Sequence, residues 1–144
     1  MKATLAFVIS TFFAVPGMAQ SVDEPPPVPT VEAADAGDLS QFLWKNRVLV
    51  IFSDSPGDPR FTEQIGFIEA RVDDLVDRDV IVLIDTDPAT ASTLRQKFRP
   101  RGFMLVLIGK DGAVYLRKPT AWNVREISRS IDKMPIRREE MRNR

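Results

Sequence analysis

Two short apolar runs separated by a helical pattern constrain the fold of this chain more than any other feature of its sequence. The runs are rich in β-branched residues and cover Val48–Phe52 and Val80–Ile84. Continuous apolar runs of this length are typical of strands that are buried on both faces of a sheet. Between them, apolar residues recur at spacings of three and four and mark one face of a helix that runs to about Asp77: Phe61, Ile65, Ile68, Val72 and Leu75. Two buried strands joined through a helix predict a right-handed βαβ unit.

The same dipeptide begins each of the first two predicted helices. Asp58-Pro59 and Asp87-Pro88 both place an aspartate at the N-cap and a proline at the first helical position. Leu94 and Phe98 supply the apolar face of the second helix, which we expect to end before Pro100.

A strand hairpin follows the second predicted helix. We expect its strands at Phe103–Ile108 and Val114–Leu116. The four residues before Ala113 read Gly-Lys-Asp-Gly, and Asp-Gly tolerates the positive φ angles of a tight turn.

The last predicted helix begins at Asn123. Glu126 stands three residues later and completes a capping box, while Trp122 and Ile127 occupy the two positions of a hydrophobic staple. Pro135 is expected to end this helix.

The order of these elements predicts the fold class. Residues 39–136 form an α/β, thioredoxin-like single domain with the order β-α-β-α-β-β-α. The order of the strands within the sheet does not follow from one sequence.

Residues 1–19 have the features of a secretory signal peptide. Lys2 precedes a short apolar stretch, and Gly17-Met18-Ala19 is a small-residue cleavage site. A membrane anchor is the alternative, but the stretch is shorter than the ~20 apolar residues that span a bilayer. We therefore expect cleavage after Ala19, a periplasmic or secreted location, and no membrane insertion after cleavage.

Two segments flank the predicted domain. Residues 20–38 contain Pro25-Pro26-Pro27 and several acids but no base, which predicts a disordered acidic linker. We favour a spacer over a binding motif for this segment. Residues 137–144 are predicted to be a basic C-terminal tail.

The composition excludes several functional classes. The chain has 20 basic and 20 acidic residues, so its charge offers no case for nucleic acid or an anionic membrane as a partner. It has no cysteine and no histidine, which excludes His-dependent nucleophilic triads and zinc sites built on those ligands. No glycine-rich phosphate loop occurs, and we expect no cofactor.

Three motifs carry a family resemblance. They are residues 39–47 (LSQFLWKNR), 102–112 (GFMLVLIGKDG) and 131–141 (IDKMPIRREEM). Together they resemble the P-DUDES family, a bacterial domain of unknown function that is similar to a domain of vertebrate extracellular proteins such as equarin and the sushi-repeat proteins. The resemblance covers about residues 38–141 and implies a thioredoxin-like, peroxiredoxin-related fold in an exported setting. It implies no catalytic residues, because the family has no settled activity.

Redox catalysis on this fold needs a thiolate after the first strand, above the N-terminus of the first helix. The corresponding segment is Ser53–Asp58, and the chain has no cysteine there or elsewhere. The cis-proline that precedes the third strand of thioredoxins also has no counterpart in Gly102-Phe103-Met104. Thiol–disulfide exchange and peroxidase chemistry are therefore excluded for this chain.

One group of polar residues remains as a candidate binding site. Asp54, Ser55 and Asp58 follow the first strand, and Asp85 and Asp87 follow the second. The carboxyl ends of neighbouring parallel strands meet at the edge where open α/β sheets bind ligands. Carboxylates there could hold Mg²⁺ or Ca²⁺. Capping explains Asp58 and Asp87 more simply, which leaves Asp54 and Asp85 without a local role.

Two further features have alternative interpretations. Trp44 could be an exposed recognition residue, but we favour a place at the edge of the core. The basic residues of Arg95–Arg101 could contact an anion, but cations near a helix C-terminus are also expected from the helix dipole alone.

These observations favour an exported, non-catalytic thioredoxin-like module that has a binding or structural role in the cell envelope. Its partner would be an unknown envelope protein or a small ligand. One alternative is a divalent-cation-dependent enzyme that uses Asp54 and Asp85. The other is a degenerate protein that binds redox partners without turning them over.

Overall fold

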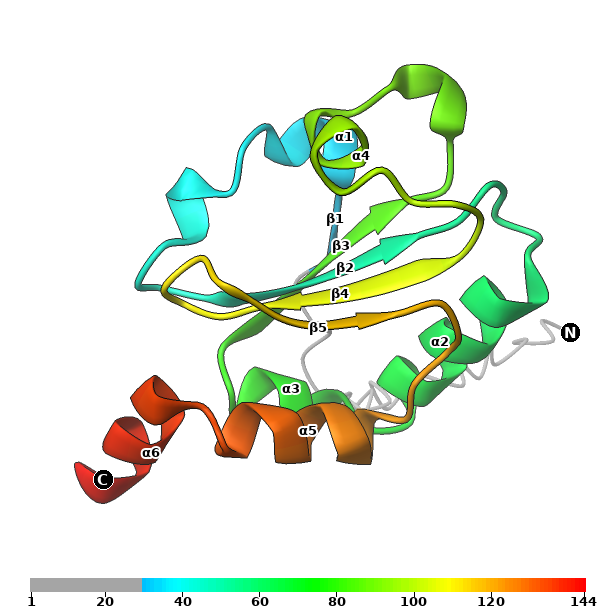
Figure 1. The fold of residues 1–144 in the computed structure, drawn as a ribbon. Helices are drawn as coiled ribbons and strands as arrows, with labels where there is room; N and C mark the ends of the chain where they lie inside the picture. Colours follow the sequence, from blue (N-terminus) through cyan, green and yellow to red (C-terminus); the bar gives the residue numbers. More distant parts are fainter. Residues whose placement is uncertain (1–29) are drawn as a thin grey trace, which may run out of the picture.

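The computed structural model of the protein describes residues 30–144. The predicted signal peptide and residues 20–29 of the predicted linker lie outside this range. The described part is a five-stranded sheet with helices on both faces (Figure 1). No helix in residues 30–144 has the length and apolar character needed to cross a membrane.

The sheet has the order β1-β3-β2-β4-β5. Its strands are β1 (Thr30–Glu32), β2 (Arg47–Phe52), β3 (Val80–Asp85), β4 (Met104–Ile108) and β5 (Val114–Lys118). The helices are α1 (Ala33–Ala36), η1 (Ser40–Phe42), α2 (Pro59–Glu69), α3 (Val72–Val76), η2 (Pro88–Thr90), α4 (Thr93–Phe98), α5 (Val124–Asp132) and α6 (Pro135–Arg142).

The strand pairing confirms the predicted βαβ unit and hairpin. β2 and β3 are parallel, with Arg47 opposite Val80 and Phe52 opposite Asp85. β4 runs antiparallel to β2 and to β5. In the turn, Gly112 has φ +80°, a conformation that glycine adopts without strain.

Each face of the sheet has its own core cluster. One cluster lies towards α2, α3 and α5 and includes Leu49, Ile51 and Leu105. The other lies towards α1 and α4 and includes Val48, Val50 and Val106. Figure 1 shows these two helical layers on opposite sides of the sheet. Both faces of β2 are covered and all six of its residues are buried, which explains why the five residues after Arg47 are all apolar.

The linker prediction is wrong for its last residues. Thr30–Glu32 form β1, which pairs parallel with β3, and Ala33–Ala36 form α1. Ala33 and Ala36 are buried against the second core cluster. The acidic and proline-rich composition hid these contacts because they depend on a strand about fifty residues away.

The first two predicted helices differ from the structure in detail. The apolar periodicity from Phe61 is interrupted at Ala70 and Arg71, so two helices, α2 and α3, replace the expected one. Asp87-Pro88 begins only the short η2, and Ser92 is the N-cap of α4 through a hydrogen bond from the Arg95 N–H.

The C-terminal region also differs from the prediction. Asn123 caps α5 by accepting a hydrogen bond from the Arg125 N–H, while Glu126 pairs with Arg129 instead of completing the capping box. As predicted, α5 ends before Pro135, at Asp132, but Pro135 is also the first residue of a further helix, α6, that the sequence did not predict.

The predicted basic tail belongs largely to α6, which packs against the domain. Arg137 is 3% exposed, and its Nη2 lies 2.9 Å from the Asp77 carboxylate. Glu140 accepts from Arg47 and Lys110 at 3.2 and 2.7 Å. These ion pairs hold α6 beside α3 and the start of β2, so the charges of this segment serve packing.

Trp44 is on the surface, which corrects the prediction of a core position. Its side chain is 70% exposed, and its φ of 61° is unusual for a bulky residue. The Trp44 N–H donates to the Lys110 carbonyl at 2.8 Å, which ties this loop to the β4–β5 turn. Trp122, by contrast, is partly buried and packs in the same core cluster as Ile127, as the staple predicts.

Candidate functional site

The five residues singled out from the sequence lie where β2 and β3 end, but most of them have structural roles. The Asp58 side chain accepts from the Arg60 N–H and forms an ion pair with its guanidinium at 2.9 Å. The Asp87 side chain accepts from the Ala89 N–H. Both therefore act as helix caps, as capping alone predicts.

Asp85 is not a free carboxylate. It is 4% exposed and forms an ion pair with Arg95, whose Nη2 lies 2.8 Å from Asp85 Oδ1. The Ser92 hydroxyl donates to its other carboxylate oxygen. Arg95 Nη2 also donates to the Ser53 carbonyl at 3.0 Å, so this buried pair ties α4 to the ends of β2 and β3.

The environment of Asp85 lowers the pKa of its carboxyl group below the ordinary value. Burial by itself would raise this pKa, but the hydrogen bonds from Arg95 and Ser92 outweigh burial. The ionised form of the carboxylate is therefore favoured, and both of its oxygens already accept hydrogen bonds from Arg95 or Ser92. The expectation that Asp85 lacks a local role is wrong.

Asp54 and Ser55 are exposed in the loop between β2 and α2. The Ser55 carbonyl accepts from the Ser53 hydroxyl at 2.7 Å, which shapes the loop. Within residues 30–144, no group of three or more carboxylates is arranged to hold a metal ion.

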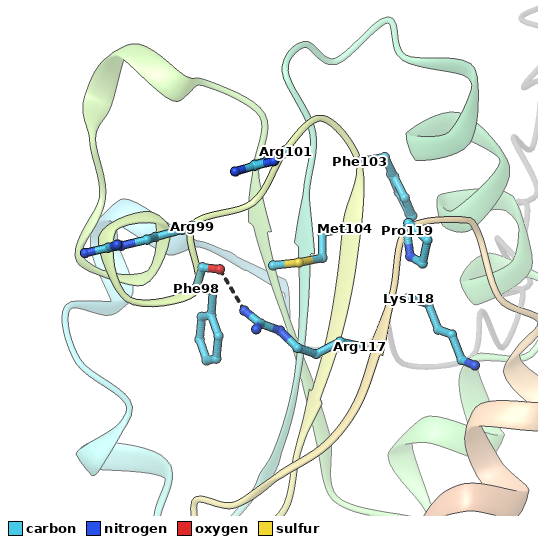
Figure 2. A pocket seen from close by; sticks show the side chains of 8 residues that line it. All are labelled: Phe98, Arg99, Arg101, Phe103, Met104, Arg117, Lys118 and Pro119. Atoms are coloured by element: carbon cyan, nitrogen blue, oxygen red, sulfur yellow. Dashed lines mark hydrogen bonds between the residues drawn. The ribbon is translucent and has the colours of Figure 1, made fainter.

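A pocket of about 310 Å³ lies at the neighbouring corner of the sheet, where β4 begins and β5 ends (Figure 2). Its eight lining residues are all basic or apolar: Phe98, Arg99, Arg101, Phe103, Met104, Arg117, Lys118 and Pro119. Three elements position them, namely the end of α4, the connection to β4 and the end of β5. Figure 2 shows Met104 between Arg101 and Arg117, with Phe103 and Pro119 on the far side. We call this the basic pocket.

Backbone conformation builds one wall of the basic pocket. Arg99 ends α4 in the left-handed region, and Gly102 has φ +67°. This positive φ is the reason that glycine suits position 102. These turns present Arg99 and Arg101 at the surface instead of continuing the helix.

The cations of the basic pocket are only partly used by the protein. Arg117 donates to the Phe98 carbonyl at 2.7 Å, and its guanidinium lies over the Phe98 ring. The exposed guanidinium groups of Arg99 and Arg101 have no hydrogen-bond or ion-pair partner among residues 30–144. A pocket with apolar walls and unpaired guanidinium groups suits an anionic group attached to an apolar body.

The sequence contained part of the signal for this pocket. The sequence offers two explanations for the basic run Arg95–Arg101, contact with an anion or the helix dipole, and the dipole does not explain the cations beyond the end of α4 at Phe98. Arg117 and Lys118 could not be associated with that run from the sequence, because the β4–β5 hairpin brings them back to it.

The fold and this site define a thioredoxin-like protein without the thiol of a redox enzyme. The matched residues 38–140 correspond to the domain of unknown function DUF4174, and the chain belongs to this family. The P-DUDES name is not confirmed and stays a resemblance.

Solved structures support the fold assignment. The chain is similar to a Plasmodium vivax 2-Cys peroxiredoxin in its reduced form, with TM-score 0.56, 18% identity, and coverage of 72% of this chain and 84% of that one. It is also similar to a chloroplastic thioredoxin z, with TM-score 0.52, 18% identity and coverage of 76% and 97%. Plasmodium yoelii thioredoxin peroxidase I gives TM-score 0.53, 18% identity and coverage of 70% and 79%. At this identity the likeness shows the fold alone. No curated protein matches the chain significantly.

Proposed function

We propose that this protein is an exported, non-catalytic binding module of the cell envelope, and that it binds an anionic group of its ligand or partner in the basic pocket. The observation that carries the proposal is the convergence of Arg99, Arg101 and Arg117 on a pocket whose other lining residues include no acid.

The non-catalytic part of the proposal rests on chemistry that the chain lacks. The loop from β2 to α2, where a thioredoxin-like enzyme carries its thiolate, contains Ser53 and Ser55 instead. The hydroxyl of Ser53 is buried and donates to a carbonyl within its own loop. No histidine is present to activate either serine.

The structure supports a cation-dependent enzyme less well than it supports anion binding in the basic pocket. Such an enzyme needs Asp54 and Asp85 to be available together, yet Arg95 and Ser92 occupy the Asp85 carboxylate. A cation would have to displace the Arg95 guanidinium group to reach this carboxylate. A thermal shift with Mg²⁺ or Ca²⁺ that disappears in Asp54→Asn would nevertheless favour the enzyme over the binding module.

Export predicts that the mature protein begins at Gln20. Cleavage after Ala19 follows from the small residues at positions 17 and 19. N-terminal sequencing of the protein recovered from the periplasm or the medium checks this expectation. Recovery of a form that starts at Met1 would contradict it.

Anion binding predicts a charge-dependent affinity. We expect citrate, measured by isothermal titration calorimetry, to bind the native domain and to bind Arg99→Gln/Arg101→Gln at least about tenfold more weakly, since a charge-assisted hydrogen bond contributes ~1.5–3 kcal/mol. The affinity of the native domain should also fall as the salt concentration rises.

The matched control is Arg125→Gln/Arg138→Gln. This variant removes the same charge from two exposed arginines whose side chains are unpaired within residues 30–144. Equal losses in the two double variants would show that net charge alone attracts citrate, and the basic pocket would then not be the site.

A further inference from the structure

We infer that the anionic partner of the basic pocket is an extended acidic peptide segment that adds to the edge strand β5. This inference rests on the proposed function and makes it more specific. It combines three independent features of the same side of the molecule: an open strand edge, a concentration of cations at one end of it, and exposed apolar side chains at the other.

β5 is an edge of the sheet. It pairs with β4 on one side, and the sheet order places no further strand of the described residues on its other side. Figure 1 shows β5 at the front edge of the sheet. Edge strands leave a row of backbone N–H and C=O groups that can pair with an added strand. The opposite edge, β1, has three residues within the described range and includes Glu32, so it suits an acidic strand less well.

The charge on and around β5 favours an acidic partner. Arg117 and Lys118 end the strand, Arg99 and Arg101 lie across the basic pocket from it, and no residue of Val114–Lys118 is acidic. Cross-strand pairs of opposite charge stabilise a sheet, and like charges destabilise it. An added strand with glutamates would therefore match this edge, and a basic strand would be repelled.

Basic residues on an edge strand can instead prevent pairing, so their direction matters. The Arg117 guanidinium group donates to the Phe98 carbonyl on the α4 side of the sheet. The Lys118 ammonium group lies 4.6 Å from the centre of the Trp122 ring, beside α5. Both cations thus contact the layers above and below the sheet, and neither covers the backbone edge.

Apolar side chains are exposed at the other end of β5. Val114 is 46% and Tyr115 40% exposed, and Leu43 and Trp44 are 38% and 70% exposed in the loop beside the turn. Trp44 donates its N–H to the Lys110 carbonyl, and the Leu43 side chain lies close to Gly112, so this loop is held against the hairpin. A strained, exposed tryptophan is typical of a recognition site.

The geometry therefore defines the chemistry of the partner. It is an extended segment of about five residues, matched to the length of β5, with carboxylates beside Arg101 and Arg117 and an apolar residue beside Trp44. Backbone pairing would supply affinity without sequence preference, and the charges would supply selectivity.

The probe for this inference is a labelled acetyl-Glu-Val-Glu-Val-Glu-amide peptide, titrated with the native domain and followed by fluorescence anisotropy. Two peptide controls separate the contributions of charge and backbone. One has lysine in place of every glutamate, and the other keeps the glutamates but is N-methylated at alternate residues along its pairing edge. We expect both controls to bind at least about tenfold more weakly than the parent peptide.

The protein variant for this test is Trp44→Asn, because asparagine tolerates a positive φ. We expect it to weaken peptide binding several-fold and to leave citrate binding unchanged. In hydrogen exchange, the parent peptide should slow exchange of β5 amides more than those of β1.

The outcomes separate this inference from the proposed function. Equal binding of the N-methylated and parent peptides would overturn strand addition, while an intact citrate site would keep the anionic pocket. Strand addition would also be overturned if none of the peptides bound. The same would follow if sedimentation showed a stable dimer and hydrogen exchange showed that β5 is protected in it without peptide. If Arg99→Gln/Arg101→Gln bound citrate as tightly as the native domain does, the proposed function itself would be overturned.

Discussion

Replacing Arg95 by methionine should lower the free energy of unfolding by about 3–5 kcal/mol, because it leaves a buried carboxylate without its cation. The Asp85 side chain is 3% exposed and the Arg95 side chain 11% exposed. Arg95 also donates to the Ser53 carbonyl and lies 5.6 Å over the Phe52 ring. Methionine keeps much of the length of the side chain, so the loss reports the ion pair more than a cavity. Urea denaturation at pH 7 measures it.

The control for this prediction is Lys97→Met on the same helix. Lys97 is exposed; its ammonium group lies 5.5 Å from the centre of the Phe98 ring and has a minor electrostatic interaction with Asp38. Its loss should therefore cost less than about 1 kcal/mol. A similar cost for the two variants would mean that the Asp85–Arg95 pair contributes little to stability.

The pH dependence of the Arg95→Met deficit gives a second readout of the pair. The lowered pKa of Asp85 means that its contribution to stability is present above the unfolded value of ~3.9 and is lost as the pH falls further. In Arg95→Met, burial without the arginine is expected to raise the pKa of Asp85. Protonation at lower pH then removes the cost of burying an unpaired carboxylate. We therefore expect the deficit to shrink as the pH falls from 7 towards 3.

The second large effect is expected for Ile68→Ala, with a loss of about 2–5 kcal/mol in the free energy of unfolding. Ile68 is 6% exposed and belongs to the core cluster beneath α2. Truncation removes apolar contacts within this core cluster and leaves a cavity behind.

Arg71→Ala is the matched comparison, with an expected loss under about 0.5 kcal/mol. Arg71 is exposed, and its only side-chain partner in the described residues is Asp74, also on the surface side of α3. Equal denaturation midpoints for the two variants would show that the helix faces are assigned wrongly.

The elements of this fold were predictable because their signals are local. The β-branched runs became β2 and β3, and the Gly-Lys-Asp-Gly sequence became the turn between β4 and β5. The errors occurred where a local signal competed with packing. The apolar periodicity continues past Ala70, where the helix is interrupted, and Pro135, which follows the end of α5 as predicted, also begins the unpredicted helix α6.

The candidate site was predictable only in part. The parallel pairing predicted that the ends of β2 and β3 lie together, and they do. Capping accounts for Asp58 and Asp87. The partner of Asp85 was not predictable, because it is separated by ten residues and reaches the carboxylate only after η2 and the turn before α4. The sequence likewise placed Trp44 in the core, whereas its loop is held outside by the hairpin.

By itself, the sequence determined the fold class, the exclusion of thiol and histidine chemistry, and the positions of most strands and helices. Periodicity, capping and residue types act over a few neighbouring positions, so one sequence is enough to interpret them. Only the tertiary structure decided which charges are used and which are free. It pairs Arg95 with Asp85 and Arg137 of α6 with Asp77, and it leaves the side chains of Arg99 and Arg101 without a partner among residues 30–144. Charge pairing depends on distances across the folded chain, and those distances are set only when the sheet brings remote segments together.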